Sequence, residues 1–299
     1  MSNGSAGSDS ANDLAAAISA ATGANTTIDA MTPLGGGCIH DAMRVTTTAG
    51  DTYFVKRGEP QDADLFAAEA DGLEALRAPG CCRIPAVITH GATSTQAFLV
   101  LEFVAPAATG DPARAGEAVA ALHGHTANAF GWHRDNYIGT TPQANREARD
   151  WAEFWRGQRL QPLLDRLARA GDERLADHGH RLAAVIPALL GDHQPQPALL
   201  HGDLWAGNAA YDEHGVPLLF DPAVYRGDHE ADLAMTELFG GFPARFYAAH
   251  EAVHPRKEGY SVRREMYNLY HVLNHALLFG GGYGDRARRM IDRLLAEAG

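Results

Sequence analysis

The sequence predicts an α+β protein in two parts, a β-rich first half and a larger, mainly helical second half. Residues 42–104 contain runs rich in Val, Thr, Tyr and Phe between turn residues, which is typical of strands. After residue 104, Ala- and Leu-rich segments with helical spacing predominate. The 299 residues, 45% of them hydrophobic, suffice for one large core or two modest ones.

The first part is expected to begin with a flexible tail at residues 1–12, which are mostly Ser, Gly, Asn and Asp, before a helix from Asp13. Residues 42–57 hold two strand-like runs about an Ala-Gly-Asp turn, which predicts a hairpin. Two further strands are predicted at residues 84–88 and 97–104.

A predicted helix at residues 62–77 carries an acid in its apolar stripe. Glu69 lies four residues after Leu65 and four before Leu73, positions that share one helix face. A buried carboxylate is costly unless a cation meets it, and Lys56 is the nearest candidate in the sequence. The alternative is a solvated Glu69 at the edge of the stripe.

The second part is expected to hold five helices, at residues 112–126, 147–170, 173–190, 229–238 and 261–279. The first two are joined by FGWHRDNYIGTTPQAN, a long connection rich in Gly, Asn, Thr and Pro. Loops of this length are more often functional than not. The boundary between the parts is expected near residues 105–111, which gives predicted domains at 13–104 and 105–299.

Composition excludes several classes of partner. A net charge of −12 argues against general affinity for nucleic acid or anionic membranes. No run approaches the ~20 apolar residues of a membrane span, and the N-terminus does not resemble a signal peptide, so a cytoplasmic location is expected. Three cysteines without CxxC spacing disfavour a disulfide framework and a structural zinc site.

The stretch LLHGDLWAGN, residues 199–208, places polar groups directly after an apolar segment. The sequence NAAYDEHGVPLLFDPA then predicts a hairpin that connects Asn208 to Asp221. Asp203, Asn208 and Asp221 could therefore converge. Such oxygen ligands suit Mg²⁺, and phosphoryl transfer needs both a metal site and a separate carboxylate that accepts a proton.

These motifs resemble a known family. The spacing of His201, Asp203 and Asn208 before Asp221 looks like the catalytic loop and metal-binding aspartate of protein-kinase-like enzymes. Together with GGGCIH, LVLEFV, DNYIGTTPQ and DPAVYRGDHEADLAMTELFGGF, they resemble the fructosamine kinase (ketosamine 3-kinase) family over nearly the whole chain. The resemblance implies a bilobal protein-kinase-like fold and ATP-dependent phosphorylation of the 3-hydroxyl of ketoamines, a deglycation reaction.

The resemblance also implies roles for single residues. Asp203 would take the proton of the sugar hydroxyl, and Asn208 and Asp221 would hold Mg²⁺. Lys56 would bind the ATP phosphates and pair with Glu69, as the buried acid requires.

Further ATP contacts are expected from a glycine loop over the phosphates and a hinge that meets adenine through backbone groups. These residues are Gly35, Gly36, Gly37, Glu102, Phe103 and Val104. Trp205 would offer the sugar an apolar face. His271 is the second substrate candidate, and a polar core strip on its helix is the alternative.

Cys38 lies in the glycine loop, where an exposed thiol beside phosphate could be oxidised. The resemblance suggests that Cys38 could join two chains, so a monomer or a redox-linked homodimer is expected. An inert thiol is the alternative.

Other functions stay open at this point. Within the same fold, the acceptor could be an aminoglycoside or a choline-like alcohol instead of a free or protein-bound ketoamine. The HEAVH stretch at His250 and His254 matches a zinc hydrolase motif, but Pro255 follows at once, and surface residues at a helix end are favoured. A catalytically silent binding protein is disfavoured because all the expected catalytic residues are present.

Overall fold

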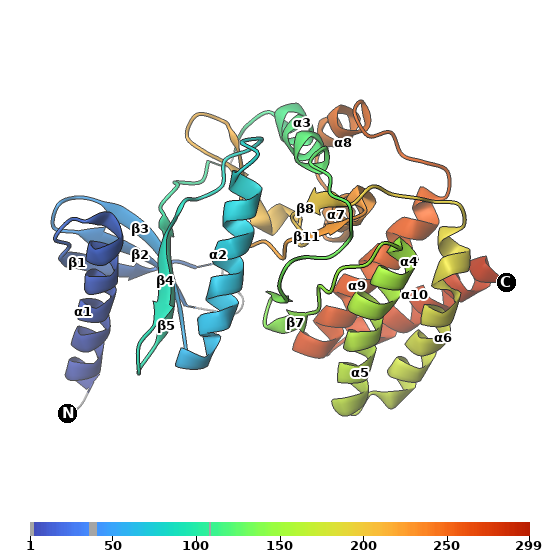
Figure 1. Cartoon of the computed structure of the whole chain (residues 1–299), viewed down its shortest axis with the longest axis horizontal. Coiled ribbons are helices and arrows are strands. Elements are labelled where there is room, and N and C mark those ends of the chain that lie inside the picture. Colours follow the sequence, from blue (N-terminus) through green and yellow to red (C-terminus); the bar gives the residue numbers. More distant parts are fainter. Residues whose placement is uncertain (1–2, 36–40, 108) are drawn as a thin grey trace.

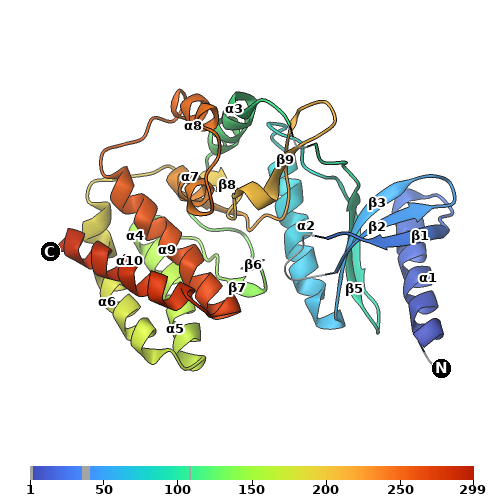
Figure 2. The ribbon, with the colours of Figure 1, turned by 180° about the vertical axis from the view of Figure 1, so that it is seen from behind.

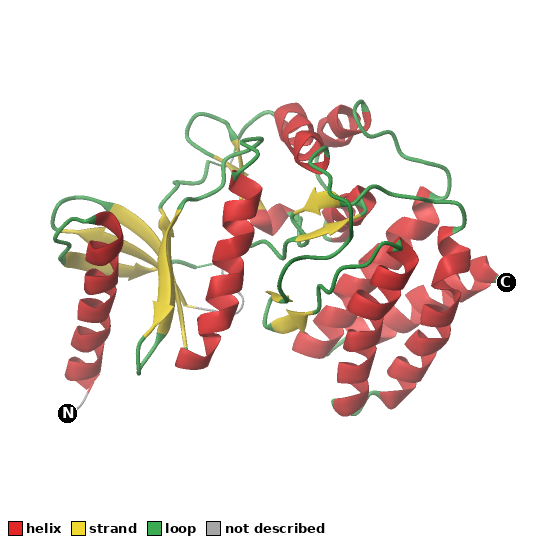
Figure 3. Cartoon of the chain, in the orientation of Figure 1, coloured by secondary structure: helices red, strands yellow, loops and turns green. Residues whose placement is uncertain are grey.

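The computed structural model describes residues 3–35, 41–107 and 109–299, with side chains from Ser10 onward. The chain forms two lobes, with the termini at opposite ends of the long axis (Figure 1). Figure 3 shows that the smaller lobe is built around a sheet and the larger one is mainly helical. The predicted α+β class with a bilobal arrangement is confirmed.

The smaller lobe holds a five-stranded sheet in the order β1-β2-β3-β5-β4, with every neighbouring pair antiparallel. Its strands are β1 (Ile28–Pro33), β2 (Asp41–Thr47), β3 (Thr52–Gly58), β4 (Val87–Ala92) and β5 (Ala97–Glu102). Helices α1 (Asn3–Thr22) and α2 (Ala63–Arg77) cover opposite faces of the sheet (Figures 1 and 2).

The continuous apolar run of β5 follows from this arrangement. Phe98 and Val100 pack with α1, whereas Leu99 and Leu101 pack with α2. A strand buried on both faces needs apolar residues at every position rather than at alternate ones. The core around α2 continues into the larger lobe through Leu199, so α2 links the sheet to the catalytic half.

Two predictions for this lobe are corrected. The expected flexible tail is wrong from Asn3 onward, because α1 begins there. Polar contacts hold this segment, since the Ser10 hydroxyl donates to Gln96 Oε1 at 2.7 Å. The strand expected at 84–88 begins only at Val87, because the chain just before Ile84 pairs with β10 (Pro217–Leu219) instead, where the N–H of Arg83 donates to the carbonyl of Pro217 at 2.8 Å. Strand β1 was not predicted.

The larger lobe contains most of the helices. They are α3 (Pro112–His123), α4 (Trp151–Phe154), α5 (Gln161–Arg169), α6 (Glu173–Leu190), α7 (His229–Leu238), α8 (Ala244–Glu251), α9 (Tyr260–Phe279) and α10 (Tyr283–Ala298). Its short strands are β6 (Asn136–Ile138), β7 (Thr141–Gln143), β8 (Ala198–Leu200), β9 (Ala209–Tyr211), β10 (Pro217–Leu219) and β11 (Tyr225–Gly227). Within the described ranges, none of the helices is both long and apolar enough to cross a membrane.

The helix predictions at 173–190 and 229–238 are confirmed as α6 and α7, and that at 261–279 is confirmed as α9 to within one residue. The helix expected at 147–170 is interrupted by a π-helical turn over Trp155–Leu160. Pro162 explains part of this break, because it lacks the N–H that a continuous α-helix would need. Helices α8 and α10 were not predicted.

Two strand pairs position the loop that holds His201, Asp203 and Asn208. Strand β8 pairs with β11, so Leu200 lies opposite Tyr225. The predicted hairpin that connects Asn208 to Asp221 is confirmed as β9 and β10. The chain therefore leaves β8, passes through the loop, and returns to Asp221 beside it.

Candidate active site

The ion pair predicted for the buried acid of α2 is present. Lys56 Nζ lies 2.6 Å from Glu69 Oε1 and 2.8 Å from Asp221 Oδ1. The side chains of Lys56 and Glu69 are 13% and 10% exposed, whereas that of Asp221 is 44% exposed. One ammonium group thus connects the sheet, α2 and the larger lobe.

Burial and charge act in opposite directions on this group. Burial opposes the charged form of Lys56, but Glu69 and Asp221 outweigh it and raise the lysine pKa. For Glu69, burial is the largest influence and raises the carboxyl pKa, while Lys56 opposes it. The pair stays ionised only as long as both partners are present.

Asn208 joins Asp203 to Asp221. Its side-chain Nδ2 donates to the backbone carbonyl of Asp203 at 2.9 Å and to Asp203 Oδ2 at 3.1 Å. The same nitrogen lies 3.4 Å from the carbonyl oxygen of Asp221. The predicted convergence of these three residues is therefore present.

Asp203 has the electrostatic character of a base that works near neutral pH. Burial, followed by the charge of Asp221, raises its pKa from 3.8 to about 7, and the hydrogen bond from Asn208 opposes this rise. The side chain keeps 23% of its exposure, so a ligand can reach it. A general base is most effective when its pKa lies near the working pH.

Uncommon backbone conformations mark both ends of the site, without strain at Gly202 and with strain at Asp221. Gly202 has φ of +82°, and a Cβ there would lie 2.0 Å from the carbonyl oxygen of Ala223. Asp221 has φ of +57°, and it alone among the described non-glycine residues adopts a positive φ. Such strain tends to occur where a side chain must be aimed.

Asp232, on α7, holds the backbone of the loop before Asp203. The sequence analysis assigned this residue no role. Its carboxylate accepts the backbone N–H of His201 at 2.7 Å and that of Gly202 at 2.8 Å. Its side chain is 1% exposed. The sequence signal that could have identified Asp232 is an acidic residue within an apolar helical stretch, the same signal that identified Glu69.

The two acceptor-side candidates both lie near Asp203. His271 Nδ1 is 3.9 Å from Asp203 Oδ1. Burial, with smaller effects of His275 and Arg159, lowers the His271 pKa to about 3, so this imidazole is neutral. Trp205 packs edge-on against Phe239, with ring centroids 5.9 Å apart.

The expected hinge follows β5. The backbone N–H of Glu102 donates to the carbonyl of Ala86 at 2.8 Å, and the Glu102 side chain pairs with Arg83. The guanidinium of Arg44 lies 5.0 Å from the ring centroid of Phe103, and Val104 is half-buried. The N–H of Glu102 is therefore already engaged, which leaves adenine contacts to the other backbone groups of this segment.

The expected phosphate loop is described only in part. Gly35 is exposed, and a Cβ at this position would meet no atom within 4 Å. The predictions for Gly36, Gly37 and Cys38 concern positions outside the described residues.

The DNYIGTTPQ segment supports the chain after Asp221. Asn136 Nδ2 donates to the carbonyl of Val224 at 2.7 Å, and Gln143 Nε2 donates to that of Ala223 at 3.2 Å. Gln143 also donates to Asn136 Oδ1 at 2.8 Å. The long connection thus has a positioning function that its length and composition suggested.

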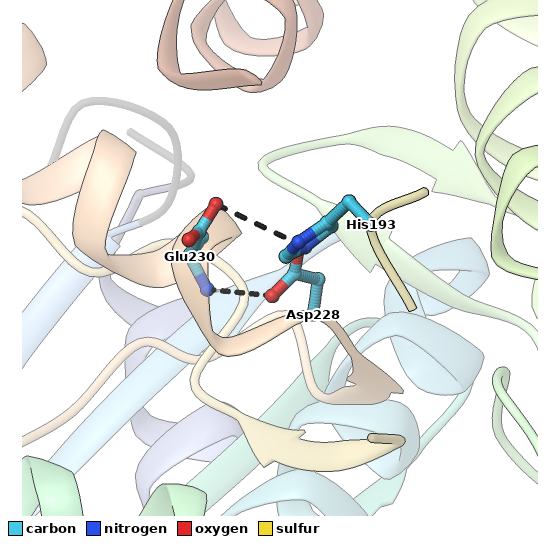
Figure 4. A group of neighbouring side chains, drawn as sticks. All are labelled: His193, Asp228 and Glu230. Carbon is cyan, nitrogen blue, oxygen red and sulfur yellow. Dashed lines mark hydrogen bonds and ion pairs between the residues drawn. The ribbon is translucent and has the colours of Figure 1, made fainter. Parts of the chain in front are cut away.

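A second group of potential ligands lies outside this site. Figure 4 shows His193, Asp228 and Glu230 facing one another at the start of α7. His193 Nε2 is 2.6 Å from Asp228 Oδ2, and Arg263 makes two hydrogen bonds to Glu230, at 2.5 and 2.9 Å. The arginine already supplies the cation for this buried cluster.

The two histidines of the HEAVH motif do not share one helix, as the disfavoured zinc interpretation would require. Helix α8 ends at Glu251, before His254 is reached. His254 Nε2 contacts the carbonyl oxygen of Ala120 at 2.9 Å. The favoured expectation of surface residues is wrong for His250, which is fully buried against His123.

The donor set at Asn208 and Asp221 fits a magnesium ion. Hydrogen bonds fix the Asn208 amide through its nitrogen, which leaves the amide oxygen for another partner. Asp221 contacts Lys56 through Oδ1, and its side chain is accessible. One carboxylate and one amide oxygen are the protein ligands that Mg²⁺ commonly combines with phosphate oxygens and water.

Comparison with known proteins agrees with this geometry. The family model for fructosamine kinase matches residues 10–297. A protein of Synechocystis named probable ketoamine kinase is 44% identical over 94% of this chain and 96% of its own length. The protein-ribulosamine 3-kinase of Arabidopsis thaliana is 40% identical over 91% of this chain and 85% of its own.

Solved structures extend the comparison to the fold. A fructosamine-3-kinase homologue from Haemophilus somnus superposes with a TM-score of 0.87 at 27% identity, covering 94% of this chain and 96% of its own. An aminoglycoside phosphotransferase, 15% identical with a TM-score of 0.59 over 91% and 95% of the two chains, shares the fold alone. The bilobal protein-kinase-like fold is confirmed, and the chain belongs to the fructosamine kinase family.

Proposed function

We propose that this protein transfers the γ-phosphoryl group of ATP to the 3-hydroxyl of a ketoamine, a sugar adduct formed when an amine is glycated. Membership of the fructosamine kinase family and the name of the Arabidopsis relative support this reaction class. The observation that carries the proposal is the convergence of Asp203 and Asn208 with the Lys56–Glu69–Asp221 group, which is suited to hold phosphates. The raised pKa of Asp203 is consistent with the role of a base.

Asp203 accepts the proton of the acceptor hydroxyl. At the same time, the hydroxyl oxygen bonds to the γ-phosphorus, and the bond between that phosphorus and the ADP oxygen breaks. Asn208 holds Asp203 through one hydrogen bond to its backbone carbonyl and one to its carboxylate, which helps to orient that carboxylate. Lys56 neutralises phosphate charge, and Glu69 keeps its ammonium group in place. Positioning and charge stabilisation are the main requirements of phosphoryl transfer.

Asn208 and Asp221 are the residues that would hold Mg²⁺, which supplies charge neutralisation on the transferring phosphate. Gly35, Gly36 and Gly37 would cover the phosphates. Backbone groups of Glu102, Phe103 and Val104 would meet adenine. The N–H of Glu102 is not among them, because it donates to the carbonyl of Ala86.

On the acceptor side, Trp205 provides a half-buried aromatic face, and His271 provides a neutral imidazole close to the base. Both are suited to a sugar, which has apolar faces and hydroxyl groups. The acceptor is a small-molecule ketoamine or a glycated protein side chain. Dimerisation through Cys38 stays part of this proposal and is testable by non-reducing electrophoresis.

The test is Mg²⁺-dependent ATP consumption with a fructosamine, a ribulosamine and an aminoglycoside as acceptors. Asp203→Asn should abolish turnover, whereas Glu213→Gln, at a 76% exposed position in the β9–β10 turn, should leave it unchanged. Turnover on the aminoglycoside alone would assign the protein to the aminoglycoside class of acceptors instead. If none of the three acceptors supports ATP consumption, the ketoamine assignment is refuted.

A further inference from the structure

A chain of buried side chains leads from helix α8 to the catalytic loop. His250 Nε2 lies 3.0 Å from His123 Nδ1, and His123 Nε2 lies 3.1 Å from Asp232 Oδ2. His123 and His250 are 2% and 0% exposed. Because Asp232 holds two backbone N–H groups of the loop, the two histidines are connected to the residue before Asp203.

The hydrogen bonds define where the protons lie. Burial raises the pKa of the Asp232 carboxyl, and the backbone N–H groups of Gly202 and His201 oppose that rise. Because these two groups can only donate, they are met best by the carboxylate form. His123 then donates through Nε2 and presents a lone pair at Nδ1, since a neutral imidazole has one N–H. His250 must meet that lone pair with its own Nε2–H.

Two further observations agree with this assignment. Burial is the main cause that lowers the pKa of both imidazoles, to about 2 for His250, so each carries a single N–H. With the proton on Nε2, the lone pair of His250 falls on Nδ1. That atom is buried and has no hydrogen-bond partner among the described residues.

The helices that carry the histidines are closely packed. Helix α3 lies beside α8 in Figures 1 and 2, and a Cβ at Gly116 of α3 would lie 2.2 Å from the carbonyl oxygen of Phe246 in α8. His123 is the last residue of α3, and His250 is near the end of α8. The close contact fixes the separation of the two imidazoles.

We propose that His250 and His123 act as a two-histidine relay that positions the catalytic loop through Asp232. Neither touches the reacting atoms, so both are positioning residues, and their effect on catalysis rests on the function proposed above. The His123 N–H shares the negative charge of a fully buried carboxylate. Without it, Asp232 would take up a proton more readily and hold the N–H groups of His201 and Gly202 less firmly.

The test uses matched substitutions. His123→Gln keeps a side-chain N–H that can reach Asp232, whereas His123→Leu removes it at similar volume. His250→Leu removes the donor to His123, and the double Leu variant completes a cycle. His254→Leu is the control for packing, because the His254 ring lies near those of His123 and His250, with centroids 6.4 and 5.5 Å away, but makes no hydrogen bond to either ring.

Two readouts are required. Amide hydrogen exchange over residues 199–203 reports the loop directly, and steady-state kinetics with MgATP reports its effect on turnover. We expect His123→Leu and His250→Leu to speed exchange and lower kcat at least roughly tenfold, with KM for ATP within about twofold. In His123→Gln, both the exchange rate and kcat should be close to those of the wild type. The double Leu variant should show no faster exchange and no lower kcat than His123→Leu, and His254→Leu should change neither quantity.

Unchanged exchange in His123→Leu, an equally impaired His123→Gln, or additive effects in the double variant would each overturn the relay. If the wild-type protein phosphorylates none of the acceptors, the proposed function fails. The exchange measurement still decides whether the relay holds the loop.

Discussion

Replacing Asp203 by Asn should make the protein inactive and more stable. The Asp203 carboxyl has a pKa of about 7 in the folded protein, against 3.8 for an unperturbed aspartate, chiefly because it is buried. A difference of about three pKa units corresponds to about 4 kcal/mol. This is the upper bound of what the ionised carboxylate costs the unliganded fold.

The pH dependence of this gain has a definite sign. Between pH 3.8 and about 7 the folded state binds the Asp203 proton more tightly than the unfolded state, so stability falls as the pH rises. Above about pH 7 both states are ionised, and the cost is constant. The gain from Asp203→Asn should therefore be largest above pH 7 and shrink toward pH 4.

The assay is urea unfolding of wild type and variant at pH 8 and pH 5, without metal or nucleotide. We expect a gain of about 1–3 kcal/mol at pH 8, below the upper bound because the amide also changes the contact with Asn208. Glu213→Gln controls for lost negative charge in a chain of net charge −12. No gain at pH 8, a gain that is the same at pH 5, or an equal gain in Glu213→Gln would refute the reasoning.

Three further predictions follow from the same geometry. Glu69→Gln removes one of the two carboxylates that hold Lys56, so kcat/KM for ATP should fall at least roughly tenfold; a change below twofold in the same kinetic assay would contradict this role. Gly202→Ala should destabilise by about 3 kcal/mol in urea unfolding, because it adds a collision with the Ala223 carbonyl to the strain of a positive φ. Gly50→Ala, at φ of +92° with no atom within 4 Å of the added Cβ, should lose only about 1 kcal/mol, and equal losses would argue against the collision. Removing Mg²⁺ with EDTA should stop ATP consumption and added Mg²⁺ should restore it; turnover that persists in EDTA would exclude Asn208 and Asp221 as essential metal ligands.

The features that the sequence predicted best are those that leave a pattern within a short stretch of residues. Helices α6 and α7 match their predicted ranges, and the partner of Glu69 could be inferred because a buried acid needs a cation. Asp203, Asn208 and Asp221 were recognised through fixed spacing. In each case the signal is local in the sequence, even where the contact is not.

The remaining features depend on contacts between distant segments. Asp232 reaches back to His201 and Gly202 across about 30 residues of sequence, and no spacing rule connects them. His250 was expected at the surface because a proline follows its motif, but it is buried beside His123, 127 residues away. The tail prediction failed because composition says little about a segment that a distant residue, Gln96, holds by hydrogen bonds.

The charges of the site lead to one more prediction, on Mg²⁺. Above about pH 7, Asp203, Asp221 and Glu69 bring three carboxylates to the site, and Lys56, which contacts Glu69 and Asp221, brings one ammonium group. These four groups have a surplus of two negative charges, which a divalent cation matches. Asp221 is the second-largest cause of the raised pKa of Asp203, so an ion bound at Asp221 should lower that pKa without touching Asp203. Saturating Mg²⁺ should therefore narrow the difference in unfolding free energy between Asp203→Asn and wild type at pH 8. If Mg²⁺ leaves that difference unchanged, the ion does not bind beside Asp221 in the unliganded protein.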